Sequence, residues 1–143
     1  MIERDYLMRM LQDFFTMLAK LLRQKVEEPD KVHIQERFNE MYRQFFRKSA
    51  DHFYALDKET ILDDLTKEEL SETEQMAMVQ MLSELLYQDG LIKNDVVEKI
   101  SLLDKSLFMM KYLDRNSKTY SWDREQKMSD IQTILTEYDV KKG

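Results

Sequence analysis

The sequence predicts an all-α protein of about five helices, arranged as stacked antiparallel hairpins. The 143 residues include only two glycines and one proline, the residue types that most often interrupt regular structure. Apolar residues recur at intervals of three and four, which places them on one face of a helix. The length suits one domain, so we expect a single helical domain over residues 1–143.

The first helix is expected over residues 2–27 and the second over residues 30–48. The apolar stripe of the first consists of Leu7, Leu11, Phe14, Leu18 and Leu21. The stripe of the second consists of Ile34, Phe38, Met41 and Phe45. Pro29 separates the two, because proline is tolerated in the first turn of a helix but not in its interior.

The segment that follows is expected to contain little regular helix. Residues 49–58 form an ordered connection, because apolar side chains anchor it, and residues 60–65 form at most a short helix. Thr66 has the spacing from Glu69 that is typical of a capping box, in which a side chain at the helix start accepts a backbone N–H.

Three further helices follow, over residues 71–88, 94–114 and 121–138. Ser71 and Glu74 form a second candidate capping box, which opens the first of these helices. Asp89-Gly90 is expected to end it, because glycine tolerates the left-handed conformation found after helices. Asn94 and Ser121 are the expected N-caps of the other two.

Two segments resemble known helical proteins. Residues 1–10, Met-Ile-Glu-Arg-Asp-Tyr-Leu-Met-Arg-Met, resemble the start of a family of short, all-helical bacterial proteins of unknown function. That resemblance implies no catalytic residues. Residues 82–90 and 105–107 are similar to the two helices of a tetratricopeptide-like hairpin, although the segment between them is about four residues longer than the usual 34-residue repeat allows. This second resemblance implies shared hairpin packing.

Composition excludes several classes of site. The chain has no cysteine, so it cannot form a disulfide framework or a zinc–thiolate site. No apolar run reaches the roughly 18–20 residues that cross a bilayer, and charged residues near the first methionine are unlike a signal peptide. We therefore expect a cytoplasmic protein without membrane contact. The net charge of −6 makes nucleic acid an unfavourable partner, because nonspecific binding depends on clustered cations.

The candidates for catalysis or metal binding are few. The chain has two histidines, His33 and His52, and neither has the spacing that places two metal ligands on one helix face. Asp51, His52 and Tyr54 are close in sequence, so a ligand or enzymatic site near them remains an alternative. We expect no catalytic residue, no cofactor and no metal.

An aromatic and basic stretch gives another alternative. Interleaved aromatic and cationic side chains can stack nucleic-acid bases. However, the aromatics lie on or beside the apolar stripe of the second helix, so core packing is the favoured interpretation. The residues concerned are Tyr42, Arg43, Phe45, Phe46, Arg47, Lys48, Phe53 and Tyr54.

The leading hypothesis is a non-enzymatic protein-interaction or scaffold module that binds a protein partner or a second copy of itself. Methionines make adaptable binding surfaces as well as cores, and tryptophan is a frequent interface anchor. The candidate contact residues are Met76, Met78, Met81 and Trp122.

Overall fold

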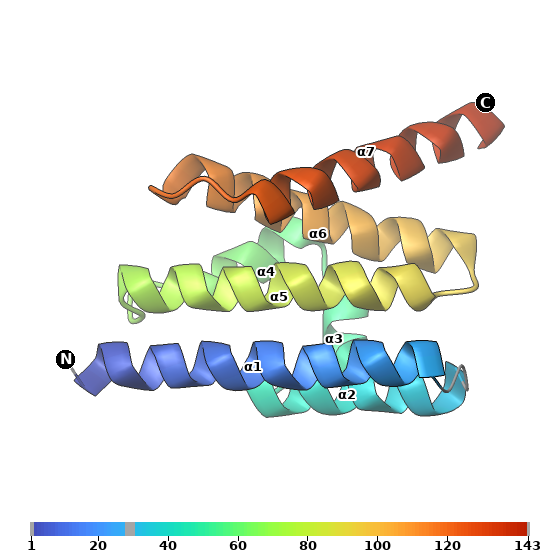
Figure 1. Ribbon diagram of the computed structural model, residues 1–143. Coiled ribbons are helices and arrows are strands. Elements are labelled where there is room, and N and C mark those ends of the chain that lie inside the picture. The colour runs from blue at the N-terminus through green and yellow to red at the C-terminus, as the bar shows by residue number, and fades with distance from the viewer. Residues whose placement is uncertain (1, 28–30, 143) are drawn as a thin grey trace. The chain divides into compact units, whose positions relative to one another are not determined.

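The computed structural model describes residues 2–27 and 31–142, and this part of the chain forms seven helices and no strand (Figure 1). The all-α class is therefore confirmed, whereas the expected count of about five helices is wrong. The chain divides into two compact units, Met1–Leu56 and Asp57–Gly143, and each is described by itself. The single domain expected over residues 1–143 stays a prediction.

The first unit begins with an antiparallel pair, α1 (Ile2–Glu27) and α2 (Lys31–Phe46) (Figure 1). The predicted stripes are buried at nearly every position, and Phe14 and Phe38 have no exposed surface. Phe14 of α1 meets Phe45 of α2 edge to face, with the ring centroids 5.1 Å apart. The break expected at Pro29 lies outside the described residues.

The second helix ends two residues earlier than predicted because the backbone adopts the left-handed conformation at Arg47. Arg47 has φ 57°, the left-handed conformation common just after a helix, and its N–H donates to the Arg43 carbonyl at 3.0 Å. Ser49 then caps α3 (Ala50–Ala55), a six-residue helix that the sequence analysis described only as a connection. Phe53 of this helix stacks on Tyr42 at 5.4 Å. The aromatic contact explains why so short a helix is held in place.

The second unit begins with α4 (Lys58–Leu65), which Asp57 caps by accepting the Thr60 N–H. This helix contains the short helix expected over residues 60–65. Thr66 does not open a helix, as the proposed capping box required. It ends α4 instead, with its hydroxyl donating to the Leu62 carbonyl at 2.8 Å.

The next helix, α5 (Glu72–Ile92), is the most deeply buried in the unit. Ser71 caps it as predicted and accepts the Glu74 N–H at 3.1 Å. The predicted stop at Asp89-Gly90 is wrong, because the helix continues for two more residues and Gly90 is buried inside it. A Cβ at Gly90 would lie 3.1 Å from Leu103 Cδ2 and 3.3 Å from Leu102 Cβ. Any side chain at residue 90 would therefore need Leu102 and Leu103 to shift by a few tenths of an ångström, and glycine avoids this crowding.

That neighbouring helix is α6 (Val96–Asn116), which returns antiparallel to α5 (Figure 1). Its N-cap is Asp95, which accepts the Glu98 N–H, and not the predicted Asn94. Between the two helices the Ser106 hydroxyl donates to the Ser83 carbonyl at 2.7 Å, and both serines are buried. Ser83, Gly90 and Ser106 thus form a line of small residues along the α5–α6 contact.

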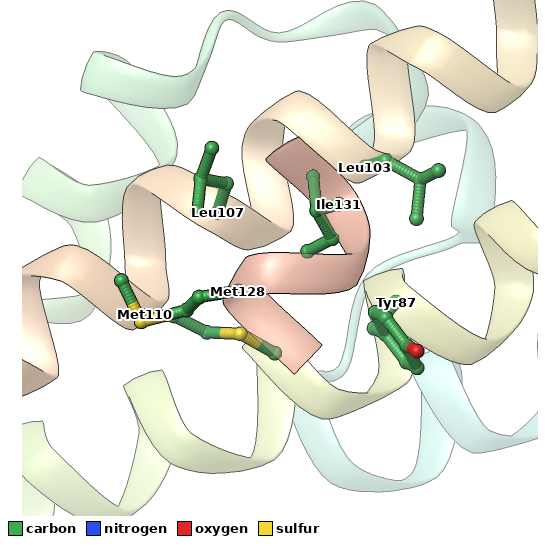
Figure 2. Close-up of a cluster of buried hydrophobic side chains, with 6 residues drawn as sticks. All are labelled: Tyr87, Leu103, Leu107, Met110, Met128 and Ile131. Carbon is green, nitrogen blue, oxygen red and sulfur yellow. The ribbon is translucent and has the colours of Figure 1, made fainter. Parts of the chain in front are cut away.

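The last helix, α7 (Trp122–Lys142), packs on α6. Ser121 caps it as predicted, accepting the Arg124 N–H at 3.1 Å. Figure 2 shows the cluster that joins α5, α6 and α7: Tyr87, Leu103, Leu107, Met110, Met128 and Ile131. The helix runs four residues beyond the predicted end at residue 138.

We predict that Gly90→Val lowers the free energy of unfolding by about 1–3 kcal/mol, because added methyl groups overpack a tight contact. Gly90→Ala should change it far less, since the gain in helix propensity of about 1 kcal/mol offsets the crowding. Urea unfolding followed by circular dichroism measures both changes. Gln80→Val, at an exposed position of α5, is the matched control. Equal effects of valine at residues 80 and 90 would contradict the packing role.

Candidate functional site

The four candidate contact residues differ in exposure. Met81 has no exposed surface, and Met76 and Met78 are half-buried. Trp122, in contrast, is 68% exposed. Of these four residues, only Trp122 presents a large apolar surface to solvent. Met81 has no accessible surface with which to contact a partner.

Trp122 has an exposed aromatic neighbour that the sequence analysis did not select. Tyr120 is 73% exposed and precedes Trp122 by two residues, in the connection between α6 and α7. We call these two residues the aromatic corner. In the sequence, Tyr120 stands out only as an aromatic residue within a polar turn. That pattern does not distinguish an exposed ring from a buried one.

The backbone of the aromatic corner is held by several hydrogen bonds. The Ser117 hydroxyl accepts the Thr119 N–H at 3.2 Å. The Arg124 guanidinium donates from Nε to Asp114 Oδ1 at 2.7 Å and from Nη2 to the Thr119 carbonyl at 3.3 Å. With the Ser121 cap, these bonds tie both sides of Tyr120 to the ends of α6 and α7. These bonds restrain the backbone that carries the two exposed rings.

A buried lysine holds the first turns of α7 against α5. Lys127 Nζ lies 2.7 Å from Glu84 Oε1 and 2.7 Å from Asp123 Oδ2. It also lies 5.7 Å from the centre of the Tyr87 ring, within the range of a cation–π contact. Lys127 and Glu84 side chains are only 17% and 12% exposed. A largely buried ion pair of this kind orients the helix that begins with Trp122.

The pKa values of these groups follow from their surroundings. Burial alone would lower the pKa of Lys127, but its hydrogen bonds to Asp123 and Glu84 outweigh burial and raise the pKa. Burial raises the pKa of Tyr87, and the charge of Asp130 raises it further. Near the corner, a hydrogen bond from Glu125 to Asp114 raises the pKa of Glu125. Because its pKa is raised, Lys127 stays charged throughout the physiological pH range.

The corner is also locally cationic. Residues 111–125 contain four basic and three acidic side chains, a net charge of +1 in a chain of net charge −6. Asp114 and Asp123 are paired with Arg124 and Lys127. Lys111, Arg115 and Lys118 are exposed, and none of them forms an ion pair with another residue in the described part of the chain.

The alternative site near Asp51 and His52 is not assembled into one cluster. Asp51 is exposed in the first turn of α3. The His52 ring packs edge to face on Phe53 at 5.0 Å, whereas the Tyr54 hydroxyl accepts a hydrogen bond from Gln35 Nε2 at 3.0 Å. Within residues 2–27 and 31–142, no three His, Asp or Glu side chains are placed to hold a metal ion.

The aromatic and basic stretch separates into core and surface. Tyr42, Phe46 and Phe53 are buried, with the Phe53 ring contacting the other two, and Phe45 and Tyr54 are half-buried. Arg43, Arg47 and Lys48 are exposed. The cations therefore lack the accessible rings that base stacking requires.

The first unit has a small pocket of about 180 Å³ between α1 and α2. The buried side chains of Leu21 and Met41 line its floor, and Lys20, Arg37 and Glu40 line its rim. Glu40 lies 3.9 Å from the Arg37 guanidinium. The pocket is open, so its polar rim is in contact with solvent.

Comparisons with known proteins do not assign this chain to a family. No protein-family model, curated protein or solved structure matched it. The two resemblances described for residues 1–10 and 82–107 stay predictions. Among the described helices, none combines the length and apolar character needed to cross a membrane.

We predict that Lys127→Met lowers the free energy of unfolding by about 1–3 kcal/mol near neutral pH, because the largely buried carboxylate of Glu84 loses its cationic partner. The folded-state pKa of Lys127 is raised. Its contribution is therefore complete below the unfolded lysine pKa of about 10.4 and is lost as pH rises through the folded-state value.

Urea unfolding at neutral and strongly alkaline pH measures this difference between the variant and the unmodified chain. Lys111→Met, which removes an exposed lysine of α6, should change stability little at either pH. A stability difference for Lys127→Met that stays constant into the alkaline range would show that the lysine charge is not its source.

Proposed function

We propose that this protein is a non-enzymatic protein-interaction module that binds its partner through the aromatic corner, Tyr120 and Trp122. The observation that carries the proposal is the 68% exposure of Trp122 on a backbone fixed by the Arg124 bonds to Asp114 and Thr119. The module would act as a scaffold or as a binding subunit.

Physical chemistry favours these two rings as binding anchors. Tryptophan and tyrosine are enriched among the few residues that supply most of the energy of an interface. Each buries a large apolar area with only two side-chain torsions to fix, and the polar atom on its ring can form a hydrogen bond. An exposed indole two residues from an exposed phenol is therefore a better anchor than the scattered exposed valines of the chain.

The fixed backbone lowers the cost of binding. Ordering a loop at an interface opposes association, and a loop held in one conformation before binding avoids that cost. Ser121 and Arg124 provide this restraint through hydrogen bonds to α7 and α6, and Lys127 ties the first turns of α7 to α5. Half-buried Met76 and Met78, in the first two turns of α5, offer adaptable apolar surface that could extend such a contact.

The tetratricopeptide-like arrangement predicted for residues 82–107 is compatible with this role. α5 and α6 form an antiparallel helical pair joined by a short connection, with small residues where they meet. Hairpins of this type stack into scaffolds that present binding surfaces.

The other hypotheses have less support. An enzymatic or ligand site near Asp51 and His52 would need convergent polar groups, but the Tyr54 hydroxyl bonds to Gln35 and the His52 ring packs on Phe53. A nucleic-acid site at Arg43, Arg47 and Lys48 would need exposed aromatic side chains, and their aromatic neighbours Tyr42 and Phe46 are buried.

We predict that replacing both rings, Tyr120→Ala with Trp122→Ala, reduces partner capture at least about tenfold, as the loss of an interface anchor of roughly 2 kcal/mol or more would do. The full chain is immobilised, incubated with lysate of its natural host, and the bound proteins are quantified by mass spectrometry.

The control is Val96→Ala with Val97→Ala, which removes two exposed apolar side chains at the start of α6. Circular dichroism verifies that both variants keep the helical fold. Capture that is equally strong with the alanine corner, or that falls equally with the valine control, would contradict the proposed role of the aromatic corner.

A further inference from the structure

The same end of the second unit carries a surface of opposite charge to the aromatic corner. Glu68, Glu69 and Glu72 are exposed in the connection between α4 and α5 and at the first residue of α5. We call these three residues the acidic loop. The one nearby lysine, Lys67, lies 3.7 Å from Asp64 Oδ1, so it does not neutralise the glutamates of the loop.

The acidic loop and the aromatic corner lie at one end of the unit because α5 and α6 are antiparallel. The loop leads into the start of α5, and the corner follows the end of α6. Figure 1 shows the loop that leads into α5 and the end of α6 at the same end of the α5–α6 pair, and the connection to α7 starts there. This end therefore has an acidic part and a part that is cationic and aromatic.

We propose that the aromatic corner binds the acidic loop of a second copy of this chain, giving a symmetric end-to-end dimer. This inference rests on the proposed function, because it names the partner of the same surface. Three exposed cations, Lys111, Arg115 and Lys118, face three exposed carboxylates of the other copy, and the reverse contact forms at the same time. Tyr120 and Trp122 are buried between the two ends.

Symmetry is the reason to prefer a second copy over an unrelated acidic partner. A two-fold axis uses one self-complementary patch twice, and a patch with separate cationic and acidic parts satisfies this condition with opposite charges at both contacts. An unrelated acidic protein would meet favourable charge at the corner but repulsion at the neighbouring acidic loop. Like charges placed together at an interface suppress such partners.

Charge reversal tests this arrangement by sedimentation equilibrium of the full chain. Arg115→Glu with Lys118→Glu reverses the corner, and Glu68→Lys with Glu69→Lys reverses the loop. Each variant alone should dimerise at least about tenfold more weakly than the unmodified chain, because both contacts then join like charges. An equimolar mixture of the two variants should recover the dimer, since both contacts again join opposite charges. Arg43→Glu with Lys48→Glu, an equal charge change on the first unit, should leave dimerisation unchanged.

Two further measurements use salt and the single tryptophan of the chain. Raising the salt concentration from about 0.05 M to about 0.5 M should weaken the dimer at least about tenfold, because screening acts strongly on exposed charges. Dimer formation should shift Trp122 fluorescence to shorter wavelength. In the monomer, iodide should quench Trp122 more efficiently than caesium, and reversal of the corner should invert that preference.

A chain that stays monomeric at millimolar concentration in low salt would overturn the dimer, as would a dimer that the mixed variants fail to recover. Salt-sensitive binding of single-stranded RNA to the corner, without dimerisation, would also overturn it. If the chain is monomeric but Trp122-dependent capture of another protein persists, only the dimer fails. If replacement of Tyr120 and Trp122 affects neither dimerisation nor capture, the proposed function fails as well.

Discussion

The close contact between α5 and α6 is the constraint on which the rest of the second unit depends. At Gly90 a side chain would crowd Leu102 and Leu103 of α6, and the small buried residues Ser83 and Ser106 meet through a hydrogen bond between the helices. The Ser106 hydroxyl satisfies its hydrogen-bonding capacity on the Ser83 carbonyl, so the close contact leaves that buried hydroxyl paired. An uncompensated hydroxyl there would cost about 1–3 kcal/mol, which is a large part of the stability of a domain of this size.

The position of α7, and with it the aromatic corner, follows from that contact. Tyr87 of α5 and Leu107 of α6 form one apolar surface only when the two helices are paired, and Met128 and Ile131 pack on it (Figure 2). Lys127 adds a directional restraint, because its bond to Glu84 joins α7 to α5, while its bond to Asp123 lies within α7. The packing sets where α7 lies, and the ion pair fixes how its first turn is oriented. Exposed Trp122 is therefore carried by the best-restrained end of the helix.

The first unit uses its aromatic residues differently. Phe14 and Phe45 pack α1 on α2, and Tyr42 with Phe53 packs α2 on α3. These rings stabilise the unit by burial and edge or stacked contacts, each pair adding about 0.5–1.5 kcal/mol beyond its area. Rings committed to a core have no surface left for a partner. Tyr6 of α1 is also exposed, but the two exposed rings of Tyr120 and Trp122 lie only two residues apart, and this pair directs the functional proposal to the second unit.

The sequence by itself determined the all-α class, the extent of α1 and the caps at Ser71 and Ser121, because local periodicity and local hydrogen bonds decide these features. The sequence also indicated Trp122 as a candidate contact residue, because a tryptophan at an expected helix start can be recognised without the structure. Tertiary structure decided the rest. Gly90 resembles a helix stop in the sequence, but in the structure it lies inside α5 against Leu103. The short helix α3 is stabilised by the stacking of Phe53 on Tyr42. Two further features depend on which segments meet in space: the exposure of Tyr120 and the bond from Lys127 to Glu84, 43 residues away. The spacing of residues along the chain does not determine these contacts.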